Sequence, residues 1–465
     1  MKIDVLVAEI GSTTTVVNAF DHLESEDPVF LGQGQAPTSV KEGDVNIGLQ
    51  AAIEDMRKNL HIENEKLEYT HMLATSSAAG GLRMTVHGLV YDMTVKAAKE
   101  AALGAGANIH LITAGKLSKV DMIKLDRIKP NIILIAGGVD YGERETALYN
   151  SELIAASDLD IPVIYAGNIA VADDVKLIFE AYSKEKNLHL VPNVYPKIDI
   201  LNIEPTREVI QDIFEKHITE AKGMEKIREM VNGPIIPTPG AVMKASKILK
   251  DEIGDLVTID VGGATTDIHS VTEGTEKVNK ILVEPEPVAK RTVEGDLGMR
   301  YSSLALYEAT SLNKIREYLG SKDSKINIRE NFKFRHENPD FVAETEDDII
   351  FDEMMAMLCT EIAMNRHVGT LESIFSPMGT LFVQNGKDLT DVKYVIGTGG
   401  IINNSRNPRK ILDLTLFNED NPLLLKPKYP KFLVDKTYIM SAMGLLANDY
   451  PDIAYQIMKE YLVEI

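Results

Sequence analysis

Glu9-Ile10-Gly11-Ser12-Thr13-Thr14-Thr15, close to the start of the chain, has a counterpart about 250 residues later in Asp260-Val261-Gly262-Gly263-Ala264-Thr265-Thr266-Asp267. In each stretch an acidic residue ends an apolar run, and glycine permits a tight turn whose backbone N–H groups and hydroxyls can point at phosphate oxygens. One Gly-Ser-Thr turn is more often structural than phosphate-binding. Two similar turns on either side of a domain boundary favour a nucleotide site.

The sequence around both turns predicts the same local structure. Strands are expected at Asp4–Ile10 and Thr14–Phe20 around the first turn, and at Asp255–Val261 and Asp267–Val271 around the second. Between the two copies, the proline-rich stretch Gly233–Gly240 interrupts the chain. We therefore expect an α/β protein with two lobes, at residues 1–240 and 241–465.

The residue types in the two turns suggest their roles. Glu9 and Asp260 would face each other across a cleft and hold a hydrated Mg²⁺ ion that neutralises phosphate charge. Together with Asp267, they are the expected catalytic residues. The expected phosphate-binding residues are Gly11, Ser12, Thr13, Thr14, Gly262, Gly263, Ala264, Thr265 and Thr266.

A third glycine-rich turn follows the apolar run at Val395 and Ile396. Its residues Gly397, Thr398, Gly399 and Gly400 would let a purine and ribose approach the backbone, because glycine has no side chain to block them. Without the paired turns, a plain strand-to-helix turn would be favoured here. Ile132–Asp140 contains a similar Gly-Gly turn, to which we assign mainly a structural role.

Alternating β and α patterns between about residues 82 and 200 predict an α/β module inserted in the first lobe, with a parallel sheet. The expected helices are Val90–Leu103, Leu117–Ile128, Glu143–Ser157 and Asp173–Tyr182, and the expected strands are Ile109–Ala114, Asn131–Ala136, Ile161–Ala166 and Leu188–Pro192. Outside the module, helices are expected at Val45–Lys58, Thr206–Lys222 and Ala241–Leu249. The polar, charge-rich residues 321–350 are expected to be a surface excursion.

Composition excludes several classes of function. The 465 residues carry a formal charge of −21, which repels nucleic-acid phosphate and anionic lipid in the absence of a basic patch. No uncharged apolar stretch approaches the ~20 residues that a membrane-spanning helix needs, so a cytoplasmic protein without nucleic-acid or membrane partners is expected. The single cysteine, Cys359, is expected to be a buried apolar residue of a helix at Asp348–Arg366.

Other polar residues have a structural interpretation beside a functional one. Arg83, expected in a loop, could reach a phosphate or form a structural ion pair. His367 is expected to cap a helix, although it could titrate near neutral pH. The acids of Glu294-Gly295-Asp296 could orient an attacking water or simply form a charged turn.

At these residues a resemblance becomes specific. Glu9–Thr15, Asp260–Asp267 and Gly397–Gly400 follow the order of the phosphate-1, phosphate-2 and adenosine motifs of the actin, sugar-kinase and heat-shock-chaperone superfamily. The stretches Pro239–Leu249 and Ser441–Leu446 resemble its two connecting helices. The resemblance implies a two-lobed, ribonuclease H-like fold that binds ATP or ADP with Mg²⁺.

A narrower resemblance covers nearly the whole chain. The stretches Ser76–Met84, Lys96–Ala107, Ile135–Glu145 and Asp260–His269 look like the accessory protein, or L component, of methylaspartate (glutamate) mutase, a family that also accompanies other adenosylcobalamin-dependent mutases. Some members carry a label from DNA mismatch repair, but the acidic balance and the absence of that repair family's ATP-binding pattern argue against repair. The chain has no Asp-x-His-x-x-Gly cobalamin signature, so it is not expected to hold the corrin through a histidine.

The resemblance implies an ATP-dependent reactivating chaperone that drives cofactor exchange in a mutase acting on glutamate, ornithine or lysine. Val16 stands where many relatives have a lysine near the phosphates, and Glu9 where most have aspartate, so slow Mg²⁺-dependent hydrolysis is expected instead of fast phosphoryl transfer. A small-molecule kinase of the same fold and a nucleotide-binding scaffold without useful turnover are the alternatives.

Overall fold

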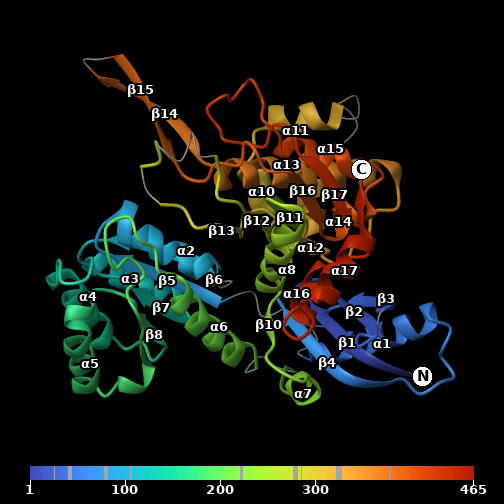
Figure 1. Cartoon of the computed structure of the whole chain (residues 1–465), viewed down its shortest axis with the longest axis horizontal. Coiled ribbons are helices and arrows are strands. Elements are labelled where there is room, and N and C mark those ends of the chain that lie inside the picture. Colours follow the sequence, from blue (N-terminus) through green and yellow to red (C-terminus); the bar gives the residue numbers. More distant parts are fainter. Residues whose placement is uncertain are drawn as a thin grey trace. The chain divides into compact units, whose positions relative to one another are not determined.

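The computed structural model describes residues 1–25, 27–39, 44–77, 82–104, 107–219, 224–275, 281–283, 285–320, 327–376 and 379–465. The chain forms two compact units. Unit 1 comprises Met1–Ala78, Glu220–Val283 and Val288–Ile465, and unit 2 comprises Ala79–Thr219 and Glu284–Pro287 (Figure 1). The small-residue stretch at 78–81, part of the resemblance at Ser76–Met84, lies outside the described residues.

The first sheet of unit 1 has the strand order β10-β4-β1-β2-β3. Its strands are β1 (Lys2–Ile10), β2 (Thr14–Asp21), β3 (Val29–Pro37), β4 (Glu68–Ser76) and β10 (Ile236–Pro237). The pairs β1–β2 and β2–β3 are antiparallel, whereas β4 runs parallel to β1 and β10 parallel to β4. The hairpin expected around the first turn is therefore present.

The second sheet of unit 1 has the strand order β13-β12-β11-β16-β17-β18. Its strands are β11 (Leu256–Val261), β12 (Thr266–Val271), β13 (Ala289–Glu294), β16 (Tyr394–Thr398), β17 (Lys431–Asp435) and β18 (Leu462–Glu464). The pairs β11–β12 and β12–β13 are antiparallel, as in the first sheet. The strand β16 runs parallel to β11, and β17 runs parallel to β16.

The two sheets share one topology, in which a three-stranded antiparallel meander is followed by two parallel strands. This repeated arrangement confirms the expected two-lobed, ribonuclease H-like fold. The register of the two hairpins is also the same, since Glu9 pairs with Val16 in the first and Asp260 with Asp267 in the second. The duplicated sequence pattern thus corresponds to a duplicated structure.

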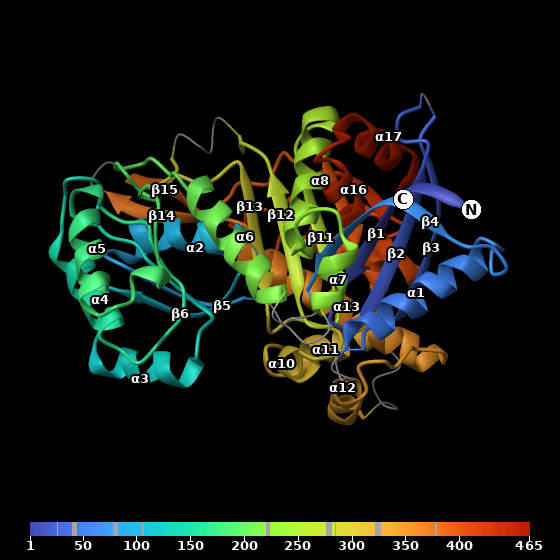
Figure 2. The same ribbon diagram turned by 90° about the horizontal axis from the view of Figure 1, so that it is seen from below.

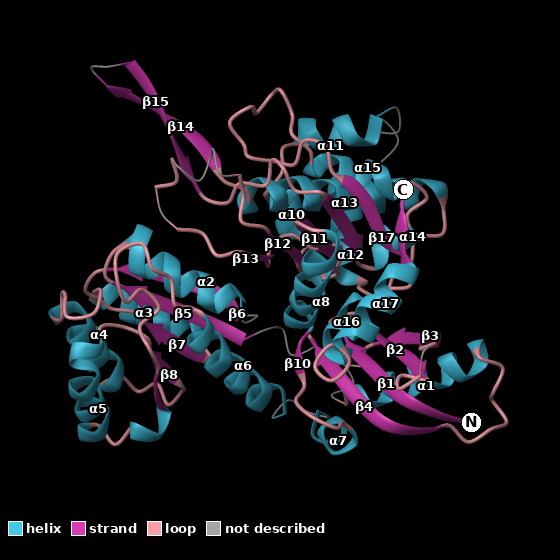
Figure 3. Cartoon of the chain, viewed as in Figure 1, coloured by secondary structure: helices cyan, strands magenta, loops and turns pink. Residues whose placement is uncertain are grey.

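Helices pack between and around the sheets of unit 1 (Figures 2 and 3). They are α1 (Val45–Asn59), α7 (Met224–Met230), α8 (Thr238–Ile253), α10 (Ser303–Glu308), α11 (Leu312–Leu319), α12 (Ile328–Glu337), α13 (Glu346–His367), α14 (Gly400–Asn404), α15 (Pro408–Leu412), the 3₁₀ turn η5 (Asp413–Thr415), α16 (Met440–Leu446) and α17 (Pro451–Tyr461).

A continuous core joins the first sheet to the second through α8, α16 and α17. The helices α8 and α16 lie so close that a Cβ atom on Gly444 would be 1.9 Å from the carbonyl oxygen of Ala241. The α8 helix begins at Thr238, earlier than expected, because Pro239 is well accommodated in a first helical turn. The lobe boundary expected at residue 240 falls inside α8 and stays a prediction.

Unit 2 has a fully parallel sheet of order β6-β5-β7-β8-β9. Its elements are β5 (Leu82–Gly88), the π-turn η1 (Tyr91–Val95), α2 (Lys96–Gly104), β6 (Ala107–Ala114), α3 (Lys119–Ile128), β7 (Ile132–Ile135), α4 (Glu145–Ala155), β8 (Val163–Tyr165), the 3₁₀ turns η2 (Ile169–Val171) and η3 (Glu185–Asn187), α5 (Ala172–Ala181), β9 (Leu188–Leu190) and α6 (Glu204–Thr219). The expected β/α alternation and parallel sheet are present.

Three features of the fold differ from expectation. The strand β5 was not predicted, because its Arg83 and His87 disguise the apolar run. The hairpin of β14 (Thr370–Ser376) and β15 (Gly379–Asn385), which extends from the second lobe in Figure 1, was also missed. Of the expected surface excursion at 321–350, residues 321–326 lie outside the described residues, and the rest is not simply at the surface, since α12 packs Phe332 and Arg335 into the core.

The described helices include none that is both long and apolar enough to cross a membrane. The cytoplasmic location stays a prediction.

Candidate functional site

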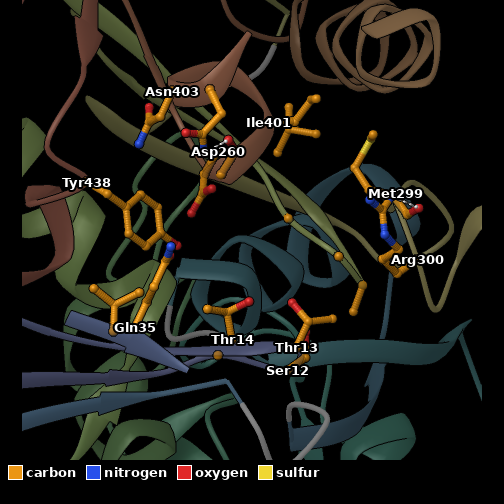
Figure 4. Close-up of a pocket in the computed structure, with 18 of the residues that line it drawn as sticks. Ser12, Thr13, Thr14, Gln35, Asp260, Met299, Arg300, Ile401, Asn403 and Tyr438 are labelled. Carbon is orange, nitrogen blue, oxygen red and sulfur yellow. Dashed lines mark hydrogen bonds between the residues drawn. The ribbon is translucent and has the colours of Figure 1, made fainter. Parts of the chain in front are cut away.

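A cavity of about 760 Å³ lies in unit 1 where the turns of the two lobes meet (Figure 4). Thr13 and Thr14 approach it from the first lobe, and Asp260 approaches it from the second. The described residues that line it from the sequence-based set are Glu9, Gly11, Ser12, Thr13, Thr14, Asp260, Gly262, Gly263, Ala264, Thr265, Asp267 and Gly400.

The two turns have the same hydrogen-bonded form. Gly11 N–H donates to the Thr14 carbonyl at 3.0 Å, and Gly262 N–H donates to the Thr265 carbonyl at 2.9 Å. They also touch, because a Cβ atom on Gly263 would lie 2.7 Å from the Thr13 methyl carbon. A side chain at position 263 would therefore require Thr13 to move.

Backbone donors at the tips of both turns are open. Within the described ranges, the N–H groups of Ser12 and Thr13 in the first turn, and of Gly263 and Ala264 in the second, have no hydrogen-bond partner in the protein. Such N–H groups around a concave turn bind anions, phosphate above all.

The remaining sequence-based residues lie behind the cavity wall. Thr266 is buried and donates to the Leu297 carbonyl at 2.8 Å. Gly397, Thr398 and Gly399 do not line the cavity, although Gly399 has a φ of 99° and a Cβ there would lie 2.5 Å from the Val261 carbonyl oxygen. Their binding roles stay predictions.

Glu9 is held by two hydroxyl groups of the second lobe. Tyr438 donates to its Oε1 at 2.6 Å, and Ser441 donates to its Oε2. Burial raises the pKa of the Glu9 carboxyl; the hydrogen bonds from Ser441 and Tyr438 oppose that change, and the charge of Asp435 adds to it. Tyr438 adopts a φ of 53°, a strained conformation for a tyrosine, in reaching Glu9.

Asp260 lacks the hydrogen bonds that hold Glu9. Its Oδ1 is buried and has no hydrogen-bond partner among the residues described, although part of the side chain reaches the cavity. Burial raises the pKa of Asp260 well above its ordinary value, and the negative charges of Asp267, Glu9 and Asp435 raise it further. An ionised Asp260 therefore calls for a cation.

Asp435 lies beneath these acids at the end of β17. It accepts the Thr398 hydroxyl at 3.0 Å and the backbone N–H groups of Ile439 and Met440 at 3.0 Å each. Asp435 and Tyr438 were missed from the sequence, and Ser441 was expected only as part of a connecting helix. An acid closing an apolar strand was the signal for Glu9 and Asp260, and the same signal could have found Asp435.

Asp267 lines the cavity from β12. Burial raises the pKa of its carboxyl to about 7; the positive charge of Arg291 acts in the opposite direction, and Glu294 adds a smaller raising effect. A carboxylate with a pKa in this range can accept a proton at neutral pH.

The carboxylates fit a magnesium ion that keeps most of its water. Oxygen donors suit a hard cation, and the buried, unpartnered Oδ1 of Asp260 is an available donor. In the described part of the chain, no three histidine, cysteine or acidic side chains are grouped closely enough to form a complete metal site. Mg²⁺ bound to a nucleotide needs only one or two protein carboxylates, because phosphates and waters supply the other ligands.

Part of the cavity lining was not anticipated. It comes from α13 and the loop before it, from the residues that follow β13 and from α14 with the residue after it: Met299, Arg300, Pro339, Asp340, Phe341, Val342, Ala343, Ile349, Asp352, Glu353, Ile401, Asn403, Asn404 and Ser405. These positions have no shared sequence pattern, because four separate segments supply them.

The secondary candidates have structural contacts. Arg83 lies on β5, not in a loop, and donates to Asn131 and to the Ile128 carbonyl. Arg366 bonds to Glu294 and Asp296 at 2.6 and 2.7 Å, and neither acid lines the cavity. His367 is fully buried and hydrogen-bonded to Thr292 and Ser270.

Burial lowers the pKa of His367 well below its ordinary value, so His367 does not titrate near neutral pH. Cys359 is fully buried, as expected, and burial raises the pKa of its thiol to about 12.

The repeated lobes and paired turns define a protein of the ribonuclease H-like ATPase fold. The family described as "MutL protein" matches residues 5–462, and the chain belongs to that family. Protein MutL of Clostridium tetanomorphum is 43% identical over 468 residues, which cover 99% of each chain.

Solved structures with similar folds are much more distant. Acetone carboxylase in nucleotide-free form is 12% identical with a TM-score of 0.41, covering 96% of this chain and 70% of that one. Diol dehydratase-reactivating factor in nucleotide-free form is 10% identical with a TM-score of 0.33, covering 96% of this chain and 99% of that one. Similarity at this level does not bear on the function of this chain.

Proposed function

We propose that the chain is an ATP-dependent accessory protein that reactivates an adenosylcobalamin-dependent mutase. The observation that supports nucleotide binding is the pair of matching turns, which present open N–H donors to one cavity beside Glu9 and Asp260. The partner class comes from the family: the chain belongs to the MutL proteins and resembles the accessory protein of methylaspartate mutase over nearly its whole length. The mutase would act on glutamate, or on ornithine or lysine.

The proposed binding mode assigns each part of the cavity a task. The N–H groups of Ser12, Thr13, Gly263 and Ala264 bind phosphate oxygens, and the glycine at position 400 leaves room for the ribose. Glu9 and Asp260 hold the water shell of Mg²⁺, which supplies charge neutralisation at the phosphates when bound.

Hydrolysis would use Asp267 as the proton acceptor for the attacking water. The pKa of about 7 suits that task at neutral pH. No lysine stands at Val16 to stabilise charge on the transferred group, so turnover is slow. The motion of the lobes during binding and hydrolysis would let the mutase release damaged cobalamin and accept an intact cofactor.

The test combines calorimetry with single-turnover hydrolysis. Mg-ATP or Mg-ADP should bind the parent protein, and a mutase should alter the hydrolysis rate. Asp260→Ala should slow hydrolysis by ~10² or more and affect binding less, because a metal-linked acid acts mainly on transition-state charge. Absence of adenine-nucleotide binding at millimolar concentration would refute the site, and an unchanged rate in Asp260→Ala would refute the role of the acid.

A further inference from the structure

The residues directly after β13 connect the second phosphate turn to a distant wall of the cavity. Met299 N–H donates to the Gly262 carbonyl at 3.0 Å, and Arg300 N–H donates to the Gly263 carbonyl at 2.7 Å. Any shift of the turn therefore displaces the backbone of Arg300. Figure 4 shows Met299 and Arg300 beside the cavity, on the side away from Tyr438.

The Arg300 side chain contacts a second part of the cavity wall, the segment Pro339–Ala343. Its Nε and Nη2 donate to the Phe341 carbonyl at 3.3 and 3.0 Å, and its guanidinium lies 5.9 Å from the centre of the Phe341 ring. Nη2 also bonds to Asp352 Oδ2 at 2.8 Å. One arginine thus ties the turn, the segment and α13 together.

A buried ion pair fixes the far end of this connection. Asp352 bonds Arg300 through Oδ2 and Arg335 through Oδ1, and the Arg335 side chain is 0% exposed. The Phe341 ring packs edge-on against Phe334, with ring centres 4.9 Å apart. Because Asp352 and Arg335 are held in the core, Arg300 has a rigid anchor.

The cavity lining contains apolar as well as polar side chains. Phe341 and Val342 of the segment Pro339–Ala343 are among the apolar ones, and so is Ile401, which follows the third glycine-rich turn. A purine has two large apolar faces, so these side chains suit it. The segment Pro339–Ala343 is then the wall beside the base.

We propose that Arg300 is a positioning residue that holds Pro339–Ala343 as the wall of the base compartment and couples base binding to the second phosphate turn. This inference rests on the proposed nucleotide site. A lysine at position 300 keeps the charge but lacks the planar fork that bonds Phe341 and Asp352 together. Arg300→Lys should therefore uncouple the wall from the turn without removing the phosphate donors.

The experiment is hydrogen exchange with and without saturating Mg-ATP, together with calorimetry, on the full chain. In the parent, Mg-ATP should protect both Gly11–Thr14 and Pro339–Ala343. In Arg300→Lys, protection of Gly11–Thr14 should persist, protection of Pro339–Ala343 should be lost, and affinity should fall about tenfold or more. Arg409→Lys is the control, because Arg409 also pairs with a carboxylate and covers an aromatic ring but does not line the cavity.

The outcomes distinguish failure of the proposed nucleotide site from failure of the role proposed for Arg300. If Mg-ATP protects neither segment of the parent, the nucleotide site is wrong, and the role of Arg300 with it. If it protects Gly11–Thr14 but not Pro339–Ala343, or if Arg300→Lys keeps the protection and affinity of the parent, only the inference about Arg300 is wrong. If Arg300→Lys loses protection equally at both segments under saturating Mg-ATP, Arg300 acts on phosphate binding. That result also refutes the inference about Arg300.

Discussion

Removing the hydroxyl of Tyr438 tests how much its hydrogen bond to Glu9 contributes to the stability of the protein. Tyr438→Phe removes the donor at 2.6 Å from Glu9 Oε1 and leaves the ring in place. A hydrogen bond to a charged group contributes ~1.5–3 kcal/mol, and loss of the donor leaves a buried acceptor with only Ser441 as a partner. We expect the free energy of unfolding of unit 1 to fall by ~2 kcal/mol at pH 8.

Denaturation by urea, followed by circular dichroism, measures this loss. The chain contains no tryptophan, so fluorescence would report tyrosines and change with the substitution itself. Tyr429→Phe is the matched control, because Tyr429 is 94% exposed and its hydroxyl loss should change stability by less than ~0.5 kcal/mol. In a Glu9→Gln background the effect of Tyr438→Phe should shrink to ~1 kcal/mol, the value of a neutral hydrogen bond. Equal stability of Tyr438→Phe and Tyr429→Phe would refute the contact.

Three further predictions concern other parts of the chain. Burial lowers the pKa of His87 from 6.5 to about 4, so its native state binds fewer protons than the unfolded state between these values, and ~3 kcal/mol of stability should be lost as pH falls from 6.5 to 4. Urea titrations should show a steeper loss of stability with falling pH in the parent than in His87→Gln, because other groups with lowered pKa values, such as His110 and His189, remain in the variant; identical slopes would contradict the prediction. Gly444→Ala should destabilise the chain by ~1–3 kcal/mol by pushing Ala241 away, whereas Gly240→Ala, whose Cβ would have no neighbour closer than 3.9 Å, should not; equal melting temperatures would contradict this. If the module contacts the mutase through α4, Glu145→Lys should weaken mutase association in a pull-down and leave basal ATP hydrolysis nearly unchanged, because Glu145 is an exposed charge; unchanged association would contradict it.

The paired turns could be predicted from sequence because each is encoded locally. An acid, a glycine and small hydroxyl residues follow an apolar strand within a few positions, so the strand, the turn and the chemistry share one stretch. The duplication then made the fold predictable, since two copies of one hairpin imply two lobes of one topology. The topology of the two sheets shows that inference to be sound.

The partners of Glu9 could not be predicted in the same way. Tyr438 lies 429 positions from Glu9 in sequence, and its hydroxyl reaches the carboxylate because α16, which begins just after Tyr438, contacts β1, which carries Glu9. No local pattern identifies a tyrosine with this role. Tyrosine disfavours a positive φ, so the positive φ of Tyr438 arises from the folded loop and could not be predicted from the residue type.

Charged residues in the core misled the prediction for residues 321–350. Arg335 is fully buried, but Asp352 neutralises it and the rings of Phe351 and Phe341 stack on its guanidinium at 4.5 and 5.3 Å. From sequence alone, arginine is expected at the surface. The acid that neutralises Arg335 lies 17 positions away on another helix, so no local pattern indicates the buried pair. The cavity-lining segment Pro339–Ala343, which we propose as the wall beside the base, was missed for the same reason.

The two lobes are alike in backbone and unlike in charge. Asp267 occupies the register position that Val16 occupies in the first lobe, since each pairs with the acid of its own turn. A similar difference recurs one strand further: Thr398 bonds to Asp435 in the second lobe, whereas Thr75 bonds to the hydroxyl of Thr238 in the first. At these matched strand positions the first lobe therefore has one carboxylate, Glu9, whereas the second has Asp260, Asp267 and Asp435. If the proposed function holds, both turns bind phosphate, and proton transfer depends on the second lobe, because Asp267 there lines the cavity and has a pKa raised to about 7.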